Sequence, residues 1–449
     1  MDVLEEKIKE TERFRDCYYQ QFPKSTLEEK KQAVREKVLP LIQDIPLDMN
    51  AHSSTSARYN YICGRILNIC MDYDANCERY LSRAVKLDPS LSDAWYELGE
   101  CVRKKEDFTT AMDCFRKSSA LNRTGKCLAS LAIVLRQIAL CTVETKIQKS
   151  LQDEAAKLSD EAVKLDPDSD KAWHTLGNSC LMQFFLKYQT NMELMEKAQK
   201  AYERALQLGD VRYSPDLHLN YSTALKFIQN YGECLKHLKI ANAYDPGFLE
   251  TKGRLETLLS FLKQINSQVQ RKGRLSAKKM KHFRSSISNE DFGVYCKKPF
   301  KKRSGKIEIL RTVSFRELKE GINDDVVICG KVVAIILNTE VIPYTFVGCD
   351  KEGSCCAFCI YNASNKFGLV IGDSVAVPEP HIVDVKLKVL LLNAGINELL
   401  FQISSEESGC ENFDFRIVRI SNPLKMLRNG KLVRMDCMAF CELAADFVH

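Results

Sequence analysis

The side chains that most often perform chemistry in proteins are scattered in this sequence. Its seven histidines stand at positions 52, 174, 218, 237, 282, 381 and 449, and none has the spacing of a metal-binding or nucleophile motif. Gly-rich phosphate loops and a Gly-x-Ser-x-Gly motif are also absent from the sequence. We therefore expect a binding protein rather than an enzyme, with no cofactor.

The nineteen cysteines are spread along the chain rather than gathered into a short disulfide framework. A zinc site would need two pairs of closely spaced ligands. No second pair follows the tightest group, so we expect no metal site and mostly small, buried, reduced thiols. That group is Cys349, Cys355, Cys356 and Cys359.

The N-terminus lacks the basic stretch and apolar run of a signal peptide, and no window approaches about 18 uninterrupted apolar residues. We therefore expect a cytoplasmic and nuclear protein without a membrane partner. Residues 271–306 hold 13 Lys or Arg against Glu290 and Asp291, a local balance of +11 in a chain of formal net charge +6. Such a basic segment indicates a polyanionic partner.

Internal repeats are the clearest signal of the elements that must position any binding site. Trp95, Leu98 and Gly99 recur as Trp173, Leu176 and Gly177. Each set precedes a segment with two small residues seven positions apart and an aromatic between them, a spacing that lets two helices pack closely. These segments contain Ala111, Phe115 and Ser118, and Ala198, Tyr202 and Ala205.

Three further segments end in Asp-Pro, at 88–89, 166–167 and 245–246, where proline stops a helix. Cys77 to Ala111 spans 34 residues, which resembles the period of the tetratricopeptide repeat. The tryptophans and aromatics are expected to be core residues, and a ligand should meet polar residues on the first helix of each hairpin. An insertion of nine residues near Gln183 to Asn191 should lengthen one hairpin.

Alternation of apolar and polar residues begins near position 305, as in Val326–Ile336 and Ala357–Tyr361. About five strands are expected, which favours an OB-fold barrel. We therefore predict an α + β multidomain chain, a tetratricopeptide-repeat solenoid followed by an OB-fold. The expected boundaries are 1–50 for an N-terminal helical segment, 51–270 for the solenoid with a closing helix, 271–304 for a basic linker, 305–410 for the barrel and 411–449 for a C-terminal extension.

A more specific resemblance rests on four runs, Val134–Gln137, Ser214–Asn220, Tyr231–Glu233 and Ile371–Pro380. Taken in this order, they resemble the Strap family, tetratricopeptide-repeat proteins with a C-terminal OB-fold. The resemblance implies two roles. One is a ribosome-associated reader of the Met-Arg-Glu start of nascent tubulin, which brings a deadenylase-recruiting adaptor to the messenger. The other is a cofactor of a histone acetyltransferase coactivator in stress-responsive transcription.

The resemblance implies peptide contacts at Arg136, Asp216 and Glu250, and contacts to ribosomal RNA near Lys278. An Arg-Glu dipeptide requires carboxylates for its guanidinium and a cation for its carboxylate, which suits this set. One basic family position is Ser276 here, so RNA contact should rely on Lys278 with Arg274 and Lys279.

Simpler interpretations of the same residues stay open. Asp216 and Glu250 could stabilise helix starts, Arg136 could be a solvated helix residue, and the basic run could be a linker or a nuclear localisation signal. The aromatic residues of the barrel could stack on single-stranded nucleic acid or fill the core, and the core role is favoured. They are Tyr344, Phe346, Phe358 and Tyr361. The leading prediction is a nascent-chain reader, and the alternative is a nuclear scaffold that binds DNA through the OB-fold.

Overall fold

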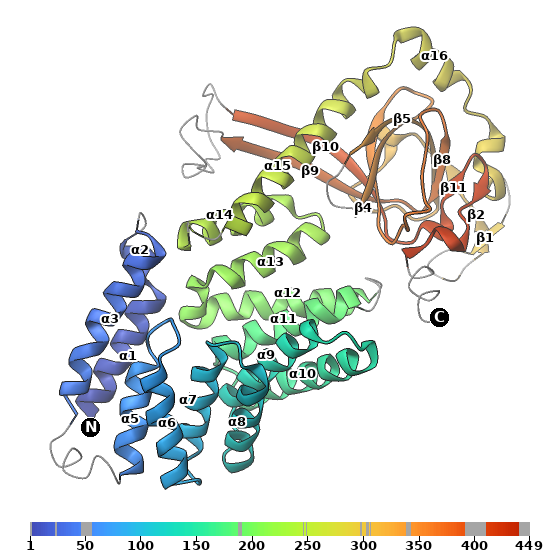
Figure 1. Cartoon of the computed structure of the whole chain (residues 1–449). Coiled ribbons are helices and arrows are strands. Elements are labelled where there is room, and N and C mark those ends of the chain that lie inside the picture. The colour runs from blue at the N-terminus through green and yellow to red at the C-terminus, as the bar shows by residue number, and fades with distance from the viewer. Residues whose placement is uncertain are drawn as a thin grey trace. The chain divides into compact units, whose positions relative to one another are not determined.

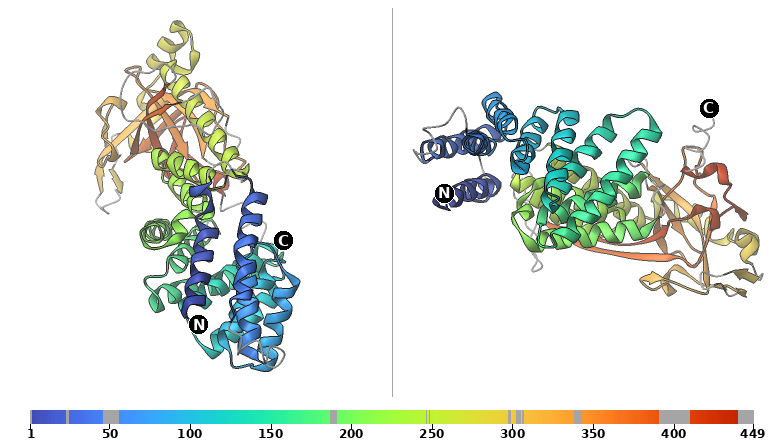
Figure 2. Two further views of the ribbon diagram at one scale, coloured as in Figure 1. Left: turned by 90° about the vertical axis from the view of Figure 1, so that its left-hand side faces the viewer. Right: turned by 90° about the horizontal axis from the view of Figure 1, so that it is seen from below.

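The computed structural model describes residues 2–22, 25–45, 56–186, 191–245, 247, 249–296, 299–301, 305, 307–337, 343–390 and 410–439. The chain divides into two compact units, Met1–Lys187 with Asn191–Thr251, and Tyr188–Thr190 with Lys252–His449. The first unit is helical and the second is built around a curled sheet (Figures 1 and 2). The predicted order of a helical solenoid followed by a β-barrel is confirmed. Among the described helices, none has both the length and the apolar character needed to cross a membrane.

The helical unit begins with α1 (Asp2–Asp16), α2 (Tyr18–Gln21) and α3 (Leu27–Gln43). Thr26 caps α3 in a capping box with Glu29, which satisfies backbone N–H groups at the start of the helix. Leu4 and Ile8 pack with Val34, Val38 and Leu41 in one buried cluster. These helices therefore form a packed addition to the repeats.

In the described part of the chain, five helical hairpins follow, and the second helix of each packs antiparallel against the first. Side-chain caps such as Ser56, Asp74, Asp107 and Thr124 define several of the helix starts. The hairpins pair α5 (Ala57–Leu67) with α6 (Ala75–Leu87), α7 (Ser92–Arg103) with α8 (Phe108–Leu121), α9 (Gly125–Cys141) with α10 (Thr145–Leu165), α11 (Asp170–Leu186) with α12 (Met192–Leu208), and α13 (Pro215–Phe227) with α14 (Tyr231–Tyr244).

The repeated small and aromatic residues form the contacts within each hairpin. A Cβ atom on Gly99 would lie 2.7 Å from the Phe115 ring, and one on Gly177 would lie 2.6 Å from the Tyr202 ring. Phe115 and Tyr202 are fully buried, so their predicted core role is confirmed. Glycine is thus required where the aromatic of the second helix presses on the first helix.

The two tryptophans are less buried than expected, although Trp95 packs against the core of the repeats. Trp95 and Trp173 are half-buried, and each donates its indole N–H to a proline carbonyl, at 2.9 Å for Pro89 and 2.7 Å for Pro167. They therefore fasten the Asp-Pro turns between hairpins. The expected insertion partly extends α11, which continues to Leu186, and its remainder at 187–190 lies outside the described residues.

The second unit contains a sheet with the strand order β12-β11-β8-β5-β6-β7-β10-β9-β4, and β3 adds to β5. β10 runs parallel to β7 and antiparallel to β9. The strands are β3 (Arg311–Thr312), β4 (Gly321–Ile322), β5 (Val326–Ile336), β6 (Tyr344–Cys349), β7 (Cys355–Ile360), β8 (Ser374–Pro378), β9 (His381–Leu390), β10 (Cys410–Ile420), β11 (Leu427–Arg428) and β12 (Lys431–Leu432); β1 (Pro299–Lys301) and β2 (Ile307–Ile309) pair separately.

β8 and β9 are not neighbours in the sheet, because four other strands lie between them in the strand order. Along the chain, however, only Glu379 and Pro380 separate them. Glu379 has a φ of 45°, and its backbone N–H donates to the Val326 carbonyl at 2.8 Å. This bend lets one continuous segment pair with β5 on one side and with β10 on the other. The sheet therefore curls into a barrel.

The barrel aromatics do not form an exposed stacking platform. Phe346, Phe358 and Tyr361 are at most 2% exposed, and the first two rings stack at 4.8 Å between centroids. Tyr344 is half-buried, and its hydroxyl accepts the backbone N–H of Leu369 at 3.0 Å. The favoured core interpretation is thus confirmed.

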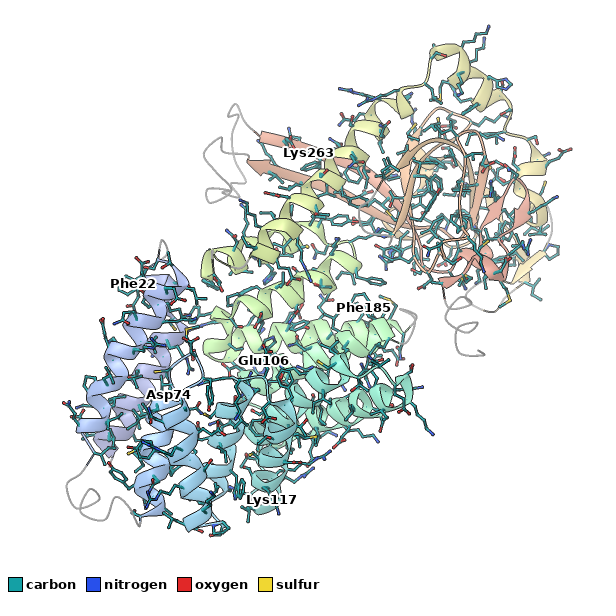
Figure 3. The ribbon with its side chains drawn as sticks, in the orientation of Figure 1. Phe22, Asp74, Glu106, Lys117, Phe185 and Lys263 are labelled. Atoms are coloured by element: carbon teal, nitrogen blue, oxygen red, sulfur yellow. The ribbon has the colours of Figure 1, made fainter. Side chains whose placement is uncertain are left out.

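The unit boundaries differ from those expected. Helix α15 (Leu249–Gln270) belongs mostly to the second unit, where Lys263, labelled in Figure 3, pairs with Glu411. Asn266 of the same helix donates to the Asn412 carbonyl. The helix that was predicted to close the solenoid therefore supports β10. The solenoid unit itself ends at Thr251 instead of 270.

The segment 271–304 is not a free linker where it is described. It contains η2 (Lys272–Arg274), α16 (Ala277–Ser285) and η3 (Asn289–Tyr295). Ile287 and Tyr295 are buried in a cluster with Val327, Ala376 and Leu427 of the barrel, because these apolar residues anchor an otherwise basic stretch. The basic linker expected at 271–304 is therefore, in its described parts, a folded portion of the second unit.

The expected barrel end at 410 is also wrong, because β10 begins there and pairs with both β7 and β9. Leu427 of β11 pairs with Ala376 of β8, so part of the expected extension 411–449 belongs to the sheet. Alternation after residue 410 indicates at most short strands at Arg416–Ile420 and Lys431–Met435, because the full length of β10 is fixed by long-range pairing.

Candidate functional site

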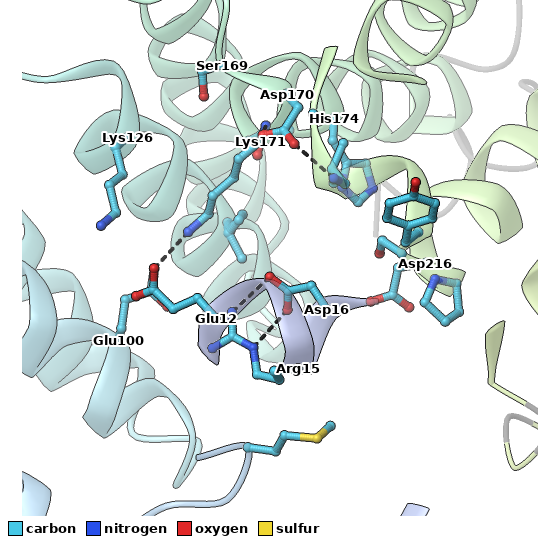
Figure 4. A pocket seen from close by; sticks show the side chains of 18 of the residues that line it. Glu12, Arg15, Asp16, Glu100, Lys126, Ser169, Asp170, Lys171, His174 and Asp216 are labelled. Carbon is cyan, nitrogen blue, oxygen red and sulfur yellow. Dashed lines mark hydrogen bonds and ion pairs between the residues drawn. The ribbon is translucent and has the colours of Figure 1, made fainter. Parts of the chain in front are cut away.

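The helical unit contains a cavity of about 1290 Å³ that is open to solvent. Its walls come from the first helices of the hairpins, as predicted, and also from α1, α3 and η1 (Asp210–Tyr213). The lining is strongly charged and carries both signs (Figure 4). Such a surface suits a ligand that itself contains both charges.

Arg136 lies on α9, and its side chain lines this cavity. It is only 8% exposed, and its Nη1 atom donates to the Thr175 carbonyl at 3.2 Å and to Ser179 Oγ at 2.8 Å. Burial lowers the pKa of Arg136 to about 10, so the guanidinium stays charged at neutral pH. Within the described part of the chain, it forms no ion pair with a carboxylate. A buried cation held only by neutral groups favours an incoming anion.

Asp216 occupies the first turn of α13, after Pro215, and also lines the cavity. Burial raises the pKa of Asp216, and the charges of Asp245 and Glu250 raise it further. Glu250 is exposed on the first turn of α15 and is not among the cavity-lining residues. Arg136 and Asp216 thus share one cavity, while Glu250 acts on Asp216 through its charge. Asp245, which also lines the cavity, was missed by the sequence argument.

A buried network at the other end of the cavity was also missed. Lys171 Nζ donates to Glu100 Oε1 at 2.9 Å, to Ser130 Oγ at 2.9 Å and to the Tyr96 hydroxyl at 3.2 Å. Although burial opposes ionisation, Lys171 and then Arg103 hold the pKa of Glu100 well below its usual range. This network supplies a set of paired charges to the wall of the cavity.

Helix α1 contributes a further wall that the repeat pattern could not reveal. Arg15 pairs with the neighbouring Asp16 through contacts of 2.8 and 3.0 Å, and it donates to the Ile69 carbonyl at 3.3 Å. Figure 4 shows Asp16 between Arg15 and Asp216. Helix α1 contacts η1, and α2 contacts α14. The N-terminal helices therefore link the first hairpin to the last.

The basic residues predicted to contact RNA lie in the second unit. Ser276 caps α16 by accepting the Lys279 backbone N–H at 3.3 Å, so the residue that departs from the basic pattern has a local structural role. Arg274, Lys278 and Lys279 are exposed, whereas Met280 on the same helix is buried. Burial of Met280 anchors α16 and leaves its cationic side chains in solvent.

No group of three or more His, Cys, Asp or Glu side chains is placed to hold a metal ion in the described ranges. The tight cysteine group is divided by strand alternation. Cys356 lies in the barrel core, and its neighbour Cys355 lies on the opposite face of β7.

Helical hairpins with glycine–aromatic packing, a charged concave cavity and a curled C-terminal sheet define a tetratricopeptide-repeat protein with an OB-fold domain. The family model described as the tetratricopeptide repeat protein 5 OB fold domain matches residues 309–442. Tetratricopeptide repeat protein 5 of Homo sapiens is 31% identical over 434 residues, covering 96% of this chain and 93% of that protein. The Mus musculus protein of that name is 30% identical, with the same shares covered.

The chain therefore belongs to the tetratricopeptide repeat protein 5 family, also called the Strap family. The resemblance inferred from the sequence motifs is confirmed, and the chain has the protein-binding, adaptor role of a repeat protein of this kind. A solved thermophilic TPR protein of Thermus thermophilus is 17% identical, covers 46% of this chain and all of its own chain, and gives a TM-score of 0.37.

Proposed function

We propose that the cavity of the helical unit binds the Met-Arg-Glu start of nascent tubulin at the ribosome. Through this contact, the protein would bring a deadenylase-recruiting adaptor to the messenger and cause co-translational decay of tubulin mRNA. The observation that carries the proposal is Arg136, a buried guanidinium that lines the cavity with neutral partners. The peptide glutamate would supply the carboxylate that this cation lacks.

The peptide arginine would bind near Asp216. Three carboxylates, those of Asp216, Asp245 and Glu250, repel one another there, which raises the pKa of Asp216 in addition to burial. A guanidinium placed among them would relieve this repulsion and could donate two parallel hydrogen bonds to one carboxylate. The Arg-Glu order of the peptide would then match an acidic subsite and a basic subsite in one cavity.

Ribosome association would use the second unit. Arg274, Lys278 and Lys279 are exposed on a surface that also carries Lys281 and Arg284. Exposed cations of this kind bind RNA phosphates through counterion release, without reading sequence. The proposal thus assigns peptide recognition to the solenoid and RNA docking to the basic segment of the barrel unit. It places the protein in the cytoplasm, with a nuclear pool for the transcriptional role of the family.

A polysome gradient with and without puromycin tests this function in cells. Puromycin releases nascent chains, so the wild-type protein should leave polysomes of tubulin messengers after treatment. An Asp216→Lys variant should be poorly associated before treatment and should fail to shorten the lifetime of tubulin mRNA. Polysome association that is unchanged by both puromycin and Asp216→Lys would contradict the proposal.

The alternative function is a nuclear scaffold that joins a histone acetyltransferase coactivator to DNA through the OB-fold. Burial of Phe346, Phe358 and Tyr361 removes the aromatic platform that was considered for DNA binding. DNA binding by the barrel would therefore have to use charged residues. Nuclear retention together with indifference to puromycin would favour this alternative.

A further inference from the structure

The β6–β7 hairpin places two cysteines directly opposite each other. Cys349 ends β6, Cys355 begins β7, and the strand register pairs them across the turn. The Asp350 backbone N–H donates to the Ser354 carbonyl at 3.0 Å, which makes 350 and 354 a hydrogen-bonded position. Because such positions alternate along antiparallel strands, Cys349 and Cys355 occupy a non-hydrogen-bonded position.

This position has the geometry that a disulfide needs. Cα atoms at non-hydrogen-bonded positions are about 4.5 Å apart, with their side chains on the same face. Disulfides span Cα separations of roughly 4.4–6.8 Å. Both thiols are free, and they are close enough for the Cys355 thiol to hydrogen-bond the Cys349 sulfur. The Cα separation typical of this register thus lies within the range that disulfides span.

The surroundings of the pair differ from those of an inert buried thiol. Cys349 is 1% exposed, whereas Cys355 is half-buried, so the pair reaches the surface through Cys355. The contact with the Cys355 thiol lowers the pKa of Cys349 against burial and the charge of Asp350, and the smaller effects of Lys272 and Arg284 act in the same direction as that contact. The same contact and burial raise the pKa of Cys355. Cys349 is therefore the member of the pair that loses its proton more readily, and Cys355 is the member that keeps it.

We propose that Cys349 and Cys355 form a redox modification site that peroxide converts reversibly into a cross-strand disulfide. The Cys349 thiolate would attack hydrogen peroxide, breaking the O–O bond to give a sulfenic acid and hydroxide. The Cys355 sulfur would then attack the Cys349 sulfur and release the sulfenic oxygen as water. Overall, two thiols and one peroxide give one disulfide and two water molecules, and a dithiol reductant reverses the change.

The site lies under the basic segment of the same unit. η2 contacts β5 and β6, and a Cβ on Gly273 would lie 2.3 Å from the Val333 carbonyl oxygen, so this backbone packs tightly on the sheet. Arg284 at the end of α16 donates to the Lys351 carbonyl in the turn at 3.0 Å. The disulfide would therefore close the turn that holds one end of the basic helix α16.

A second thiol pair provides a matched control. Cys77 on α6 and Cys101 on α7 are also in contact, but each is only 1% exposed. The pair has no half-buried member through which peroxide could enter. We therefore expect peroxide to oxidise the hairpin pair and to spare the interhelical pair.

The experiment treats the folded full-length protein with hydrogen peroxide, blocks free thiols and maps tryptic peptides without reduction. Lys351 lies between the two cysteines, so trypsin separates them unless a disulfide joins the fragments. A linked pair containing Cys349 and Cys355 is expected in the wild type and in Cys101→Ser. It should be absent from Cys355→Ser and from wild-type protein reduced after oxidation.

Fragmentation of the linked peptides distinguishes Cys355 from Cys356 and Cys359. The proposal is overturned if Cys349 is recovered as a free blocked thiol while other cysteines are oxidised. It is equally overturned if the link persists in Cys355→Ser. The unfolding temperature of untreated Cys355→Ser, measured beside the wild type, shows whether that variant is folded. If it is not, the presence or absence of the Cys349–Cys355 linked peptide in the wild type tests the proposal.

Discussion

Replacement of Arg136 by methionine should separate binding from stability. Lowering of the Arg136 pKa from 12.5 to about 10 corresponds to a cost of about 3 kcal/mol for keeping this charge in the folded state. The variant loses the contacts to Thr175 and Ser179, which are worth about 1.5–3 kcal/mol each for a charged donor. Ser179 keeps a hydroxyl contact of 2.8 Å with Ser159. The two contacts together are worth about 3–6 kcal/mol and the removed charge cost about 3 kcal/mol, so the free energy of unfolding should fall by about 0–3 kcal/mol.

Binding should respond very differently to this change. The peptide glutamate would lose its cation, which costs about 2–5 kcal/mol, or roughly 30-fold to 5,000-fold in affinity. Urea unfolding measures the stability, and calorimetry with a Met-Arg-Glu peptide measures the affinity. Arg103→Met is the comparison, because Arg103 bonds Glu100 through two contacts and helps to keep that buried carboxylate ionised.

Arg103→Met should destabilise the fold clearly, because it leaves a buried carboxylate with one cation fewer. If the free energy of unfolding falls much further in Arg136→Met than in Arg103→Met, the main role of Arg136 is to stabilise the packing of the repeats. If Arg136→Met binds the peptide as tightly as the wild type, the reasoning from its missing carboxylate partner is refuted.

Three further predictions follow from other parts of the molecule. The pKa of Asp216 is raised in the free protein, and a bound guanidinium lowers it, so peptide affinity should fall as the pH drops through the pKa of the free protein. Calorimetry at several pH values should show that the affinity of Asp216→Asn depends less on pH. Changing Lys278 and Lys279 to Glu should weaken co-sedimentation with ribosomes and make it less dependent on salt, while peptide binding stays unchanged. Wild-type association that does not depend on salt would contradict this prediction. Gly99→Ala should destabilise the fold by about 1–3 kcal/mol in urea, because its Cβ would lie 2.7 Å from a buried phenylalanine ring. Gly253→Ala has no atom within 4 Å of the new Cβ and should be neutral or slightly stabilising.

The repeats could be predicted from sequence because their packing is local. Gly99 and Phe115 lie 16 residues apart in one hairpin, and the same pairing returns as Gly177 and Tyr202. The strands β5 and β7 were also visible, as the alternating runs Val326–Ile336 and Ala357–Tyr361. β10 was not assigned to the barrel, because its place depends on pairing with β7, which lies more than 50 residues earlier.

The candidate site was predictable only in part. The residues of the motif runs indicated Arg136 and Asp216, and both line one cavity. The partners that give Arg136 its character, Thr175 and Ser179, come from the next hairpin and carry no spacing signal. Residues of α1 reach the cavity through tertiary packing alone, which a repeat pattern cannot specify. Likewise, the anchoring of 271–304 depends on Ile287 and Tyr295, two apolar residues in a basic stretch.

The most direct test of the central claim is a binding cycle between Arg136 and the third residue of the peptide. Calorimetry would compare wild type and Arg136→Met with Met-Arg-Glu and Met-Arg-Gln peptides. The account predicts that the wild type prefers glutamate, that the variant does not discriminate, and that the coupling is about 2–5 kcal/mol. Equal preference for glutamate in both proteins, or none in the wild type, would contradict it.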